Sequence, residues 1–427
     1  MAIISWRRLA RFSFLLLALA PWMATAHAAT YYVSPAGSNT NPGTLAAPFA
    51  TLQRAHDVAN PGDTIYMRGG TYRVSVRTFL TRSGSSGGYI KVFNYPGEVP
   101  VLDAAAMTAQ YDEIIRGNSI SWWHIKGLEV KNGPDAGIHL AGASSNNIIE
   151  LCVSHHNARL ANGGKGISIS ETGSNNLILN NDVHHNRYAP SPGGADGISV
   201  ASMGAGNVVR GNRVWRNSDD GIDLWGAANV LVENNWVWEN GYDDNLQPLG
   251  NGVGFKLGGA TAGDGAHTIR NNLAWRNKAN GFSDNGANLP TNVFNNTAYG
   301  NGGGSNYAFF SSVANVLKNN IALTPNAVSF NGAVQHSYNS WNLGVTVSAA
   351  DFLSLDDSGA TGPRGADGSL PAIDFLKLAA GSDLIGRGTN VGLPFTGSAP
   401  DLGAYQHGTS GSSLPAPTGL RVISTLP

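Results

Sequence analysis

The chain of 427 residues is nearly neutral, with 27 Lys and Arg against 28 Asp and Glu, so no nucleic acid or anionic membrane is expected as its partner. Its single cysteine, Cys152, excludes an intramolecular disulfide. Only 13% of the residues are charged and 55 are glycine, which favours a long all-β body over a helical one.

Residues 1–28 have the order of a secretory signal peptide. Three arginines lie within the first eleven residues, an apolar stretch covers 12–23, and Ala26-His27-Ala28 offers a cleavage site. The apolar stretch is shorter than the roughly 20 residues that span a bilayer, and Pro21 interrupts it. We therefore predict export, either to the medium or to the periplasm of a Gram-negative host. Without the three arginines the mature chain has 24 basic and 28 acidic residues, a net charge near −4.

The region that follows, 31–110, is less regular than the rest. Its pattern predicts a short helix over Leu52–Val58 and a strand over Thr64–Met67. Because a stack of coils leaves unpaired strand edges and an open core at its end, we expect the helix to cover that end.

From residue 146 onward the sequence repeats itself, and asparagine recurs at two positions of the repeat. The spacing within the second column varies from 23 to 37 residues, which indicates constant turns separated by loops of variable length. Stacked asparagines can bond to one another and to bent backbone. The first column holds Asn181, Asn212, Asn235, Asn272, Asn296 and Asn320, and the second holds Asn157, Asn186, Asn217, Asn240, Asn277 and Asn301.

Each repeat also contains a short strand that starts with glycine. Alternation directs the residue after the glycine inward and the next residue outward. The predicted inward residues are Ile138, Ile167, Ile198, Ile222, Phe255 and Phe282, and the outward ones are His139, Ser168, Ser199, Asp223, Lys256 and Ser283. This pattern predicts an all-β parallel β-helix with an asparagine ladder and an N-terminal helical cap. A leucine-rich repeat would need a leucine consensus at near-constant period, which is absent.

The repeats fade after Leu323. We expect residues 371–403 to form a terminal strand and loop that pack onto the stack, and 409–427 to be a linker or tail. Residues 29–408 then form a single catalytic domain, which we expect to be a monomer.

One repeat carries three carboxylates in five residues, in Asn217-Ser218-Asp219-Asp220-Gly221-Ile222-Asp223. One coil earlier, Asp196-Gly197-Ile198 aligns with Asp220-Gly221-Ile222, which places Asp196 about 4.8 Å from Asp220. We expect Asp196, Asp219, Asp220 and Asp223 to form one external patch. Carboxylates so close repel one another unless protons or a cation neutralise them, and hard oxygen ligands favour Ca²⁺. The alternative is that they are capping residues of a polar turn.

In the next coil Lys256 occupies the outward position over Asp223. A nearby divalent cation disfavours the ammonium form, lowers the pKa of the lysine and yields an amine that can take a proton. We therefore predict that Lys256 is a catalytic base, although a lone lysine on such a face is usually only solvated.

Three motifs follow one another along the chain: Asp-Gly, Asn-Ser-Asp-Asp-Gly-x-Asp and Gly-x-Gly-Phe-Lys-Leu-Gly-Gly. Together they resemble the pectate lyases of polysaccharide lyase family 9, and the resemblance covers roughly 120–325. The resemblance implies a right-handed parallel β-helix in which Asp196, Asp219, Asp220 and Asp223 bind catalytic Ca²⁺ and Lys256 is the Brønsted base. It implies β-elimination of an acidic polysaccharide, polygalacturonate or pectin.

Three other functions are compatible with this fold. A polygalacturonase-like hydrolase also uses clustered aspartates, but its Gly-His-Gly and Arg-Ile-Lys segments are absent from the sequence. A uronate C5-epimerase shares the proton abstraction without the elimination. A non-catalytic polysaccharide-binding β-helix would need no lysine beside the aspartates.

Two features outside this motif allow two interpretations each. The pairs His155-His156 and His184-His185 recur in adjacent repeats and are interpreted as stacked turn residues rather than as a metal site, because later repeats have Trp-Arg and Trp-Glu in the same column. The tryptophans Trp215, Trp238 and Trp275 either pack at coil corners or stack on sugars.

Overall fold

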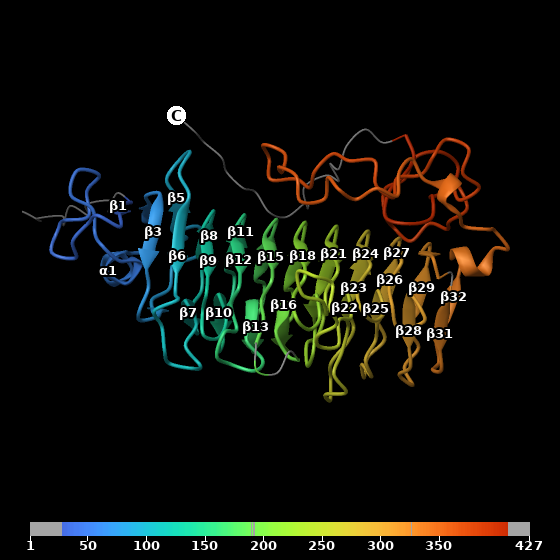
Figure 1. Ribbon diagram of the computed structural model, residues 1–427, viewed down its shortest axis with the longest axis horizontal. Coiled ribbons are helices and arrows are strands. Elements are labelled where there is room, and N and C mark those ends of the chain that lie inside the picture. The colour runs from blue at the N-terminus through green and yellow to red at the C-terminus, as the bar shows by residue number, and fades with distance from the viewer. Residues whose placement is uncertain (1–27, 189, 191–192, 326, 409–427) are drawn as a thin grey trace, which may run out of the picture.

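The computed structural model describes residues 28–188, 190, 193–325 and 327–408, and these ranges form a parallel β-helix. The predicted tail 409–427 and all but the last residue of the predicted signal peptide lie outside the described residues. Figure 1 shows the coils side by side along the long axis, from α1 at the blue end to β32 at the orange end. Three parallel sheets run the length of this stack, and each coil contributes one strand to each sheet in most of it.

Sheet A contains β1 (Thr30–Val33), β2 (Thr64–Met67), β5 (Ile90–Asn94), β8 (Trp123–Lys126), β11 (Ile148–Glu150), β14 (Leu177–Leu179), β17 (Val208–Arg210), β20 (Leu231–Glu233), β23 (Thr268–Arg270), β26 (Asn292–Phe294), β29 (Val316–Lys318) and β32 (Gln335–Ser337). Sheet B contains β3 (Gly70–Arg73), β6 (Pro100–Asp103), β9 (Glu129–Lys131), β12 (Val153–His155), β15 (Asp182–His184), β18 (Arg213–Trp215), β21 (Trp236–Trp238), β24 (Leu273–Trp275), β27 (Thr297–Tyr299) and β30 (Ile321–Leu323). Sheet C contains β4 (Thr78–Leu80), β7 (Ile115–Asn118), β10 (Ile138–Ala141), β13 (Lys165–Glu171), β16 (Asp196–Ser202), β19 (Ile222–Asp223), β22 (Phe255–Lys256), β25 (Phe282–Ser283), β28 (Tyr307–Phe309) and β31 (Val328–Phe330).

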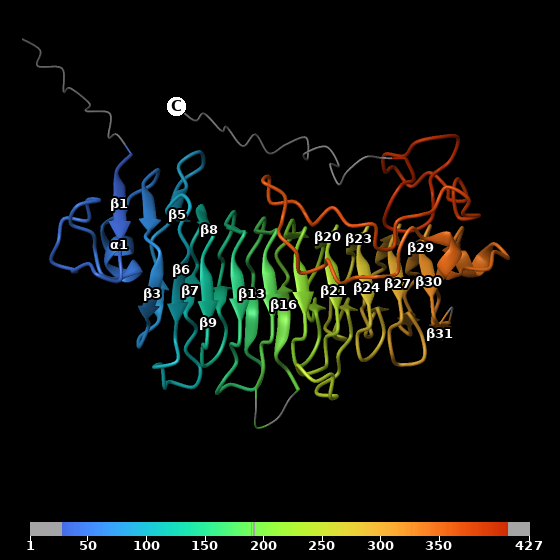
Figure 2. The same ribbon diagram turned by 45° about the horizontal axis from the view of Figure 1, so that its top comes forward.

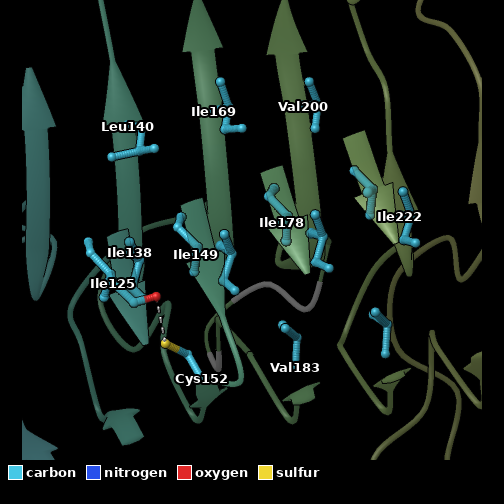
Figure 3. Close-up of a cluster of buried hydrophobic side chains, with 14 of the residues drawn as sticks. Ile125, Ile138, Leu140, Ile149, Cys152, Ile169, Ile178, Val183, Val200 and Ile222 are labelled. Atoms are coloured by element: carbon cyan, nitrogen blue, oxygen red, sulfur yellow. Dashed lines mark hydrogen bonds between the residues drawn. The ribbon is translucent and has the colours of Figure 1, made fainter. Parts of the chain in front are cut away.

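The interior consists of rows of apolar side chains that run from coil to coil. Ile138 pairs with Ile167, and the row continues through Ile198, Ile222, Phe255 and Phe282, all fully buried as predicted. Figure 3 shows a neighbouring row, Leu140, Ile169 and Val200, on successive strands of sheet C. Burial of each such side chain contributes about 1.5–3 kcal/mol, so every coil adds to one continuous core.

Asparagine ladders fix the turns between the sheets. In the first predicted column Asn181 Nδ2 donates to Asn212 Oδ1 at 3.0 Å, and in the second Asn217 Nδ2 donates to Asn240 Oδ1 at 3.0 Å. Both predicted ladders are therefore confirmed. The structure adds a third ladder, Asn147, Asn176 and Asn207, which precedes sheet A and which the sequence analysis did not identify.

The N-terminal end is covered as expected. Helix α1 (Leu52–Val58) and strand β2 have the predicted bounds, and Thr51 caps the helix by accepting a hydrogen bond from the backbone N–H of Arg54 at 3.2 Å. Leu52 and Ala55 face the core, so the helix closes the apolar interior at this end (Figure 1).

The C-terminal segment packs along the outside of the stack. Two short 3₁₀ helices, η1 (Ser340–Asn342) and η2 (Ala349–Asp351), begin this segment, which then runs back over the yellow strands (Figure 2). Its Phe375 contacts Trp275, which stacks on Trp238 at 4.7 Å. The expected packing is confirmed, but the predicted terminal strand is wrong. Among the described residues, 371–403 forms only isolated bridges, because side chains rather than a strand ladder hold it.

Within the described ranges, no helix has both the length and the apolar character needed to cross a membrane.

Candidate active site

Three consecutive strands of sheet C position the predicted site residues. Asp196 is the first residue of β16, Asp219 and Asp220 lie in the turn before β19, Asp223 ends β19, and Lys256 ends β22. Asp223 is the register partner of Lys256, as the glycine alignment predicted. The predicted alignment of Asp196 with Asp220 also holds, because the Asp220 N–H donates to Asp196 Oδ1 at 3.0 Å.

The expectation of an external patch is wrong in one respect, because these side chains are almost fully buried. Asp220 has no exposed side-chain surface, and that of Lys256 is 8% exposed. Backbone of two neighbouring loops covers the carboxylates. Gly194 and Asn251 donate to Asp219, and Val253 donates to Asp220 at 2.8 Å. The side chains do point out of the coil, but the loops that contain Gly194 and Asn251 cover them.

The structure brings three of the four predicted ligands into one cluster. One carboxylate oxygen each from Asp196, Asp219 and Asp220 lie within 4.8 Å of one another. Asp223 stands beside this cluster. Its Oδ1 accepts from the backbone N–H of Trp225 at 2.9 Å, and its Oδ2 accepts from Lys256 Nζ at 3.3 Å.

Burial and mutual repulsion dominate the electrostatics of the cluster. Burial, followed by the charge of Asp196, raises the pKa of Asp219, raises that of Asp220 well above its ordinary value and raises that of Asp223 to about 7. Burial alone would lower the pKa of Lys256, but the carboxylates of Asp223 and Asp220 outweigh it and raise the pKa. Without a metal ion the amine is therefore held as an ammonium.

The residues present fit a calcium ion. Asp220 Oδ2 is buried and accepts no hydrogen bond with acceptable geometry from the described residues, although the Lys256 ammonium lies 3.0 Å away. The ion pair compensates this oxygen only in part, because burial and the neighbouring carboxylates still keep the pKa of Asp220 well above its ordinary value. The cluster offers only hard carboxylate oxygens, with no sulfur or imidazole, which is the donor set of calcium.

Lys165 is a site residue that the sequence analysis missed. It is the register partner of Asp196, its Nζ lies 2.5 Å from Asp196 Oδ2, and the same Nζ donates to the carbonyl of Gly194 at 2.6 Å. The repeat alignment does place Lys165 beside the aspartates. It stands directly before Gly166, as Asp196 and Asp220 stand directly before the glycines of their own strands. One column therefore supplies both the carboxylates and a compensating cation.

A groove opens beside Lys256. Its lining includes Asp220, Lys278, Asn280, Asn285 and Phe310. On another side of the lysine, the ring of Trp225 is centred 4.9 Å from Nζ. A Cβ at Gly259 would come within 2.4 Å of that ring, so only glycine lets the indole lie against the chain there. Trp225 is 52% exposed and Phe310 is 47% exposed, so two aromatic side chains face solvent near the lysine.

Comparison with known proteins agrees with this fold. The chain is 36% identical to pectate lyase L of Dickeya chrysanthemi, over 88% of this chain and 90% of that protein. It is 38% identical to pectate lyase L of Paenibacillus polymyxa, over 86% and 85% of the two chains. Among solved structures, pectate lyase Pel9A superposes with a TM-score of 0.78 at 33% identity, covering 88% of this chain and 96% of that one. A rhamnogalacturonan lyase superposes with a TM-score of 0.74 at 28% identity, covering 82% and 96%.

The fold, the acidic site and these relatives define the protein as a polysaccharide lyase. Residues 31–322 match the Pel9A-like right-handed β-helix region, and the chain belongs to that family. The predicted fold class, including its right hand, and the predicted family are therefore confirmed.

Proposed function

We propose that the protein is a secreted, calcium-dependent pectate lyase that cleaves α-1,4-linked polygalacturonate by β-elimination, with Lys256 as the base. The names of the relatives support the substrate class and the reaction. One observation carries the assignment of roles. The only lysine amine in contact with both Asp220 and Asp223, among the described residues, also lines an open groove.

In this proposal the aspartates hold the cation and Lys256 moves the proton. Asp196, Asp219 and Asp220 supply the clustered oxygens, and Asp223 completes the set from the adjacent strand end. Calcium, when bound, supplies positive charge that draws electron density from the C6 carboxylate of the substrate and so acidifies the proton on C5. With the carboxylates of Asp220 and Asp223 compensated in this way, the amine of Lys256 would have a lower pKa.

The neutral amine of Lys256 then takes the C5 proton. The electron pair of the C5–H bond forms the C4–C5 double bond, and the C4–O glycosidic bond breaks. The departing oxygen keeps the electron pair of the broken C4–O bond and takes a proton, so no water is consumed. The products are a new reducing end and a 4,5-unsaturated uronate.

The aromatic side chains near Lys256 suit a saccharide substrate. The exposed indole of Trp225 offers a flat apolar face to the C–H groups of a sugar ring. The amide nitrogens of Asn280 and Asn285 donate within the protein, to Ser305 and Gly258, which leaves their side-chain oxygens to accept from the sugar hydroxyls. The side chain of Lys278 adds a positive charge to the groove, which favours an anionic polymer.

The decisive experiment incubates the purified protein with polygalacturonate, in calcium and in chelator, and follows near-ultraviolet absorbance of the unsaturated product. We expect absorbance to rise only with calcium. Saturated products formed in chelator would indicate a hydrolase, C5 inversion without cleavage would indicate an epimerase, and calcium-dependent stabilisation without product would indicate a binding protein.

Rhamnogalacturonan is the second candidate substrate, because a rhamnogalacturonan lyase superposes closely on this chain. The same assay with that polymer, in calcium, distinguishes the two by the ratio of kcat/KM. A higher value on rhamnogalacturonan would reassign the substrate while leaving the reaction unchanged.

A further inference from the structure

Four histidines form a two-by-two array on sheet B, apart from the aspartate cluster. His155 and His184 end the adjacent strands β12 and β15 and are register partners. His156 and His185 follow them in left-handed backbone, with φ of 56° and 55°. Within each coil the two rings are nearly perpendicular, and between coils like rings stack, His155 on His184 at 4.9 Å and His156 on His185 at 5.4 Å.

The ring nitrogens of this array converge. His155 Nδ1 lies 2.6 Å from His156 Nδ1, and His184 Nδ1 lies 2.7 Å from His185 Nδ1. One ring nitrogen each from His155, His156 and His184 lie within 4.8 Å of one another. Two Nδ1 atoms at such separations must share one proton, and a cation between them could replace that proton.

Two carboxylates contact the Nε2 atoms of the rings and so fix the orientation of those rings. Glu129 Oε1 lies 3.2 Å from His155 Nε2, and Asp244 Oδ1 lies 2.7 Å from His185 Nε2. A carboxylate that accepts from Nε2–H leaves Nδ1 with its lone pair exposed, which is the tautomer that ligates a metal. Carboxylates hold metal-ligating histidines in this way in known sites.

Packing alone does not account for all four imidazoles. The row continues from His184 to Trp215 at 4.2 Å and on to Trp238, so any flat ring satisfies the stacking position. The turn position after it holds Arg216 and Glu239 in the next two coils, residues with no ring. His156 is exposed and its ring contacts are with other imidazoles of the array, so the core does not require a ring there, whereas a ligand nitrogen does.

We propose that His155, His156 and His184 form a binding site for one borderline divalent cation of the zinc class (Zn²⁺, Co²⁺, Ni²⁺ or Cu²⁺), oriented by Glu129. Imidazole prefers such cations, whereas calcium takes oxygen ligands. Water completes the coordination sphere. The site is structural, because it ties two coils together, and it is independent of the proposed lyase activity.

The test titrates the full chain with Zn²⁺ by calorimetry, after chelation and in excess calcium, which competes with Zn²⁺ for the aspartate cluster. We expect one saturable site and, with Co²⁺, a visible absorption band from imidazole coordination. His156→Asn, which suits left-handed backbone, should weaken Zn²⁺ binding at least tenfold, and Glu129→Gln should weaken it about 10- to 100-fold. Circular dichroism checks that both variants fold.

His124→Gln is the matched control. His124 also pairs with a carboxylate, Glu150, at 2.8 Å, but among the described residues it belongs to no group of clustered metal-ligating side chains, so the variant should bind Zn²⁺ as the parent does. Two results would overturn the proposal: no saturable binding to the parent, or equal affinity in folded His156→Asn. Neither result depends on whether the protein cleaves polygalacturonate.

Discussion

The Nζ atom of Lys256 lies 3.0 Å from Oδ2 of Asp220, and this contact joins the candidate base to the candidate metal site. As long as the carboxylates lack a cation, they hold the lysine as an ammonium and raise its pKa. Binding a divalent cation would remove that stabilisation of the charged form. The proposed calcium ion would thus favour the neutral, basic form of Lys256 as well as acidify the C5 proton of the substrate.

Replacement of Lys256 tests its role as a base. Lys256→Ala should lower kcat by at least about 10³-fold, within the range that positioned proton transfer contributes, without weakening calcium binding. Lys256→Arg should be equally inactive, because a guanidinium keeps the charge but does not release its proton near neutral pH. Initial rates and calcium calorimetry measure both effects, with Lys126→Ala, a lysine paired to Glu150 on sheet A, as control. An active Lys256→Arg variant would show that charge alone is required.

Asp220→Asn should weaken calcium binding and stabilise the metal-free protein. Its carboxyl is fully buried and its pKa is raised well above the ordinary value, so ionisation opposes folding at neutral pH. The variant should unfold at a higher temperature than the parent in chelator and at a lower one in calcium, because it has lost a ligand. Thermal unfolding in both buffers measures this crossing. A variant less stable in both buffers would show that the charge of Asp220 stabilises the metal-free fold.

Lys165→Gln should act in the opposite sense. Its ammonium lies 2.5 Å from Asp196 Oδ2 and competes with any cation for that oxygen. Removing it should strengthen calcium binding severalfold and destabilise the protein in chelator by about 3 kcal/mol or more, because a buried carboxylate loses its partner. Calorimetry and urea unfolding measure the two effects, and Lys126→Gln controls for loss of an ion pair. Weaker calcium binding would instead assign Lys165 a supporting role in the site.

Asp135 predicts a pH dependence of stability. Burial, followed by repulsion from Glu113, raises its pKa to about 6 from 3.8. The folded state therefore holds this proton more tightly than the unfolded chain, and the resulting stability is present below about pH 4 and lost as the pH rises through 6. Asp135→Asn should match the parent near pH 4 and exceed it by up to about 3 kcal/mol at pH 8.

Urea unfolding midpoints between pH 4 and pH 8 measure this difference. Asp374→Asn, which replaces an exposed carboxylate, should follow the parent throughout. A constant difference between Asp135→Asn and the parent across the pH range would contradict the prediction.

The asparagine ladder should be costly to interrupt. Asn212 Nδ2 donates to Asn235 Oδ1, and its Oδ1 accepts from both the backbone and the side chain of Asn181. Asn212→Ala leaves these buried donors unpaired, at about 1–3 kcal/mol for each group. Asn245→Ala, at an exposed position, is the control. Asn212→Ala should have a clearly lower urea unfolding midpoint than this control. Equal midpoints would mean that water replaces the missing amide.

The coil-to-coil register followed from the sequence because the repeat itself encodes it. The glycine of each strand and the asparagine of each turn recur together, so aligning them placed Lys256 beside Asp223 and Asp196 beside Asp220, as the structure does. The inward row from Ile138 to Phe282 followed from alternation alone. Helix α1 followed from its local pattern.

The sequence could not show which backbone encloses the site, because loops of variable length carry no repeat. Gly194, Asn251 and Val253 come from such loops, and their N–H groups bury carboxylates that the repeat alone would leave exposed. The third asparagine ladder and the ion pair of Lys165 lie in columns of the same repeat, so the sequence does encode them.

The sequence by itself therefore determined the repeating fold and the neighbours across one rung, since parallel pairing stacks equal positions of successive coils. Only the tertiary structure decided burial, and with it the ionic state. It set Asp223 apart from the three clustered carboxylates, placed Lys256 as an ammonium between Asp220 and Asp223, and brought the histidine nitrogens together. The reason is physical: pairing depends on local periodicity, whereas the electrostatics of a buried group depend on every segment that packs around it.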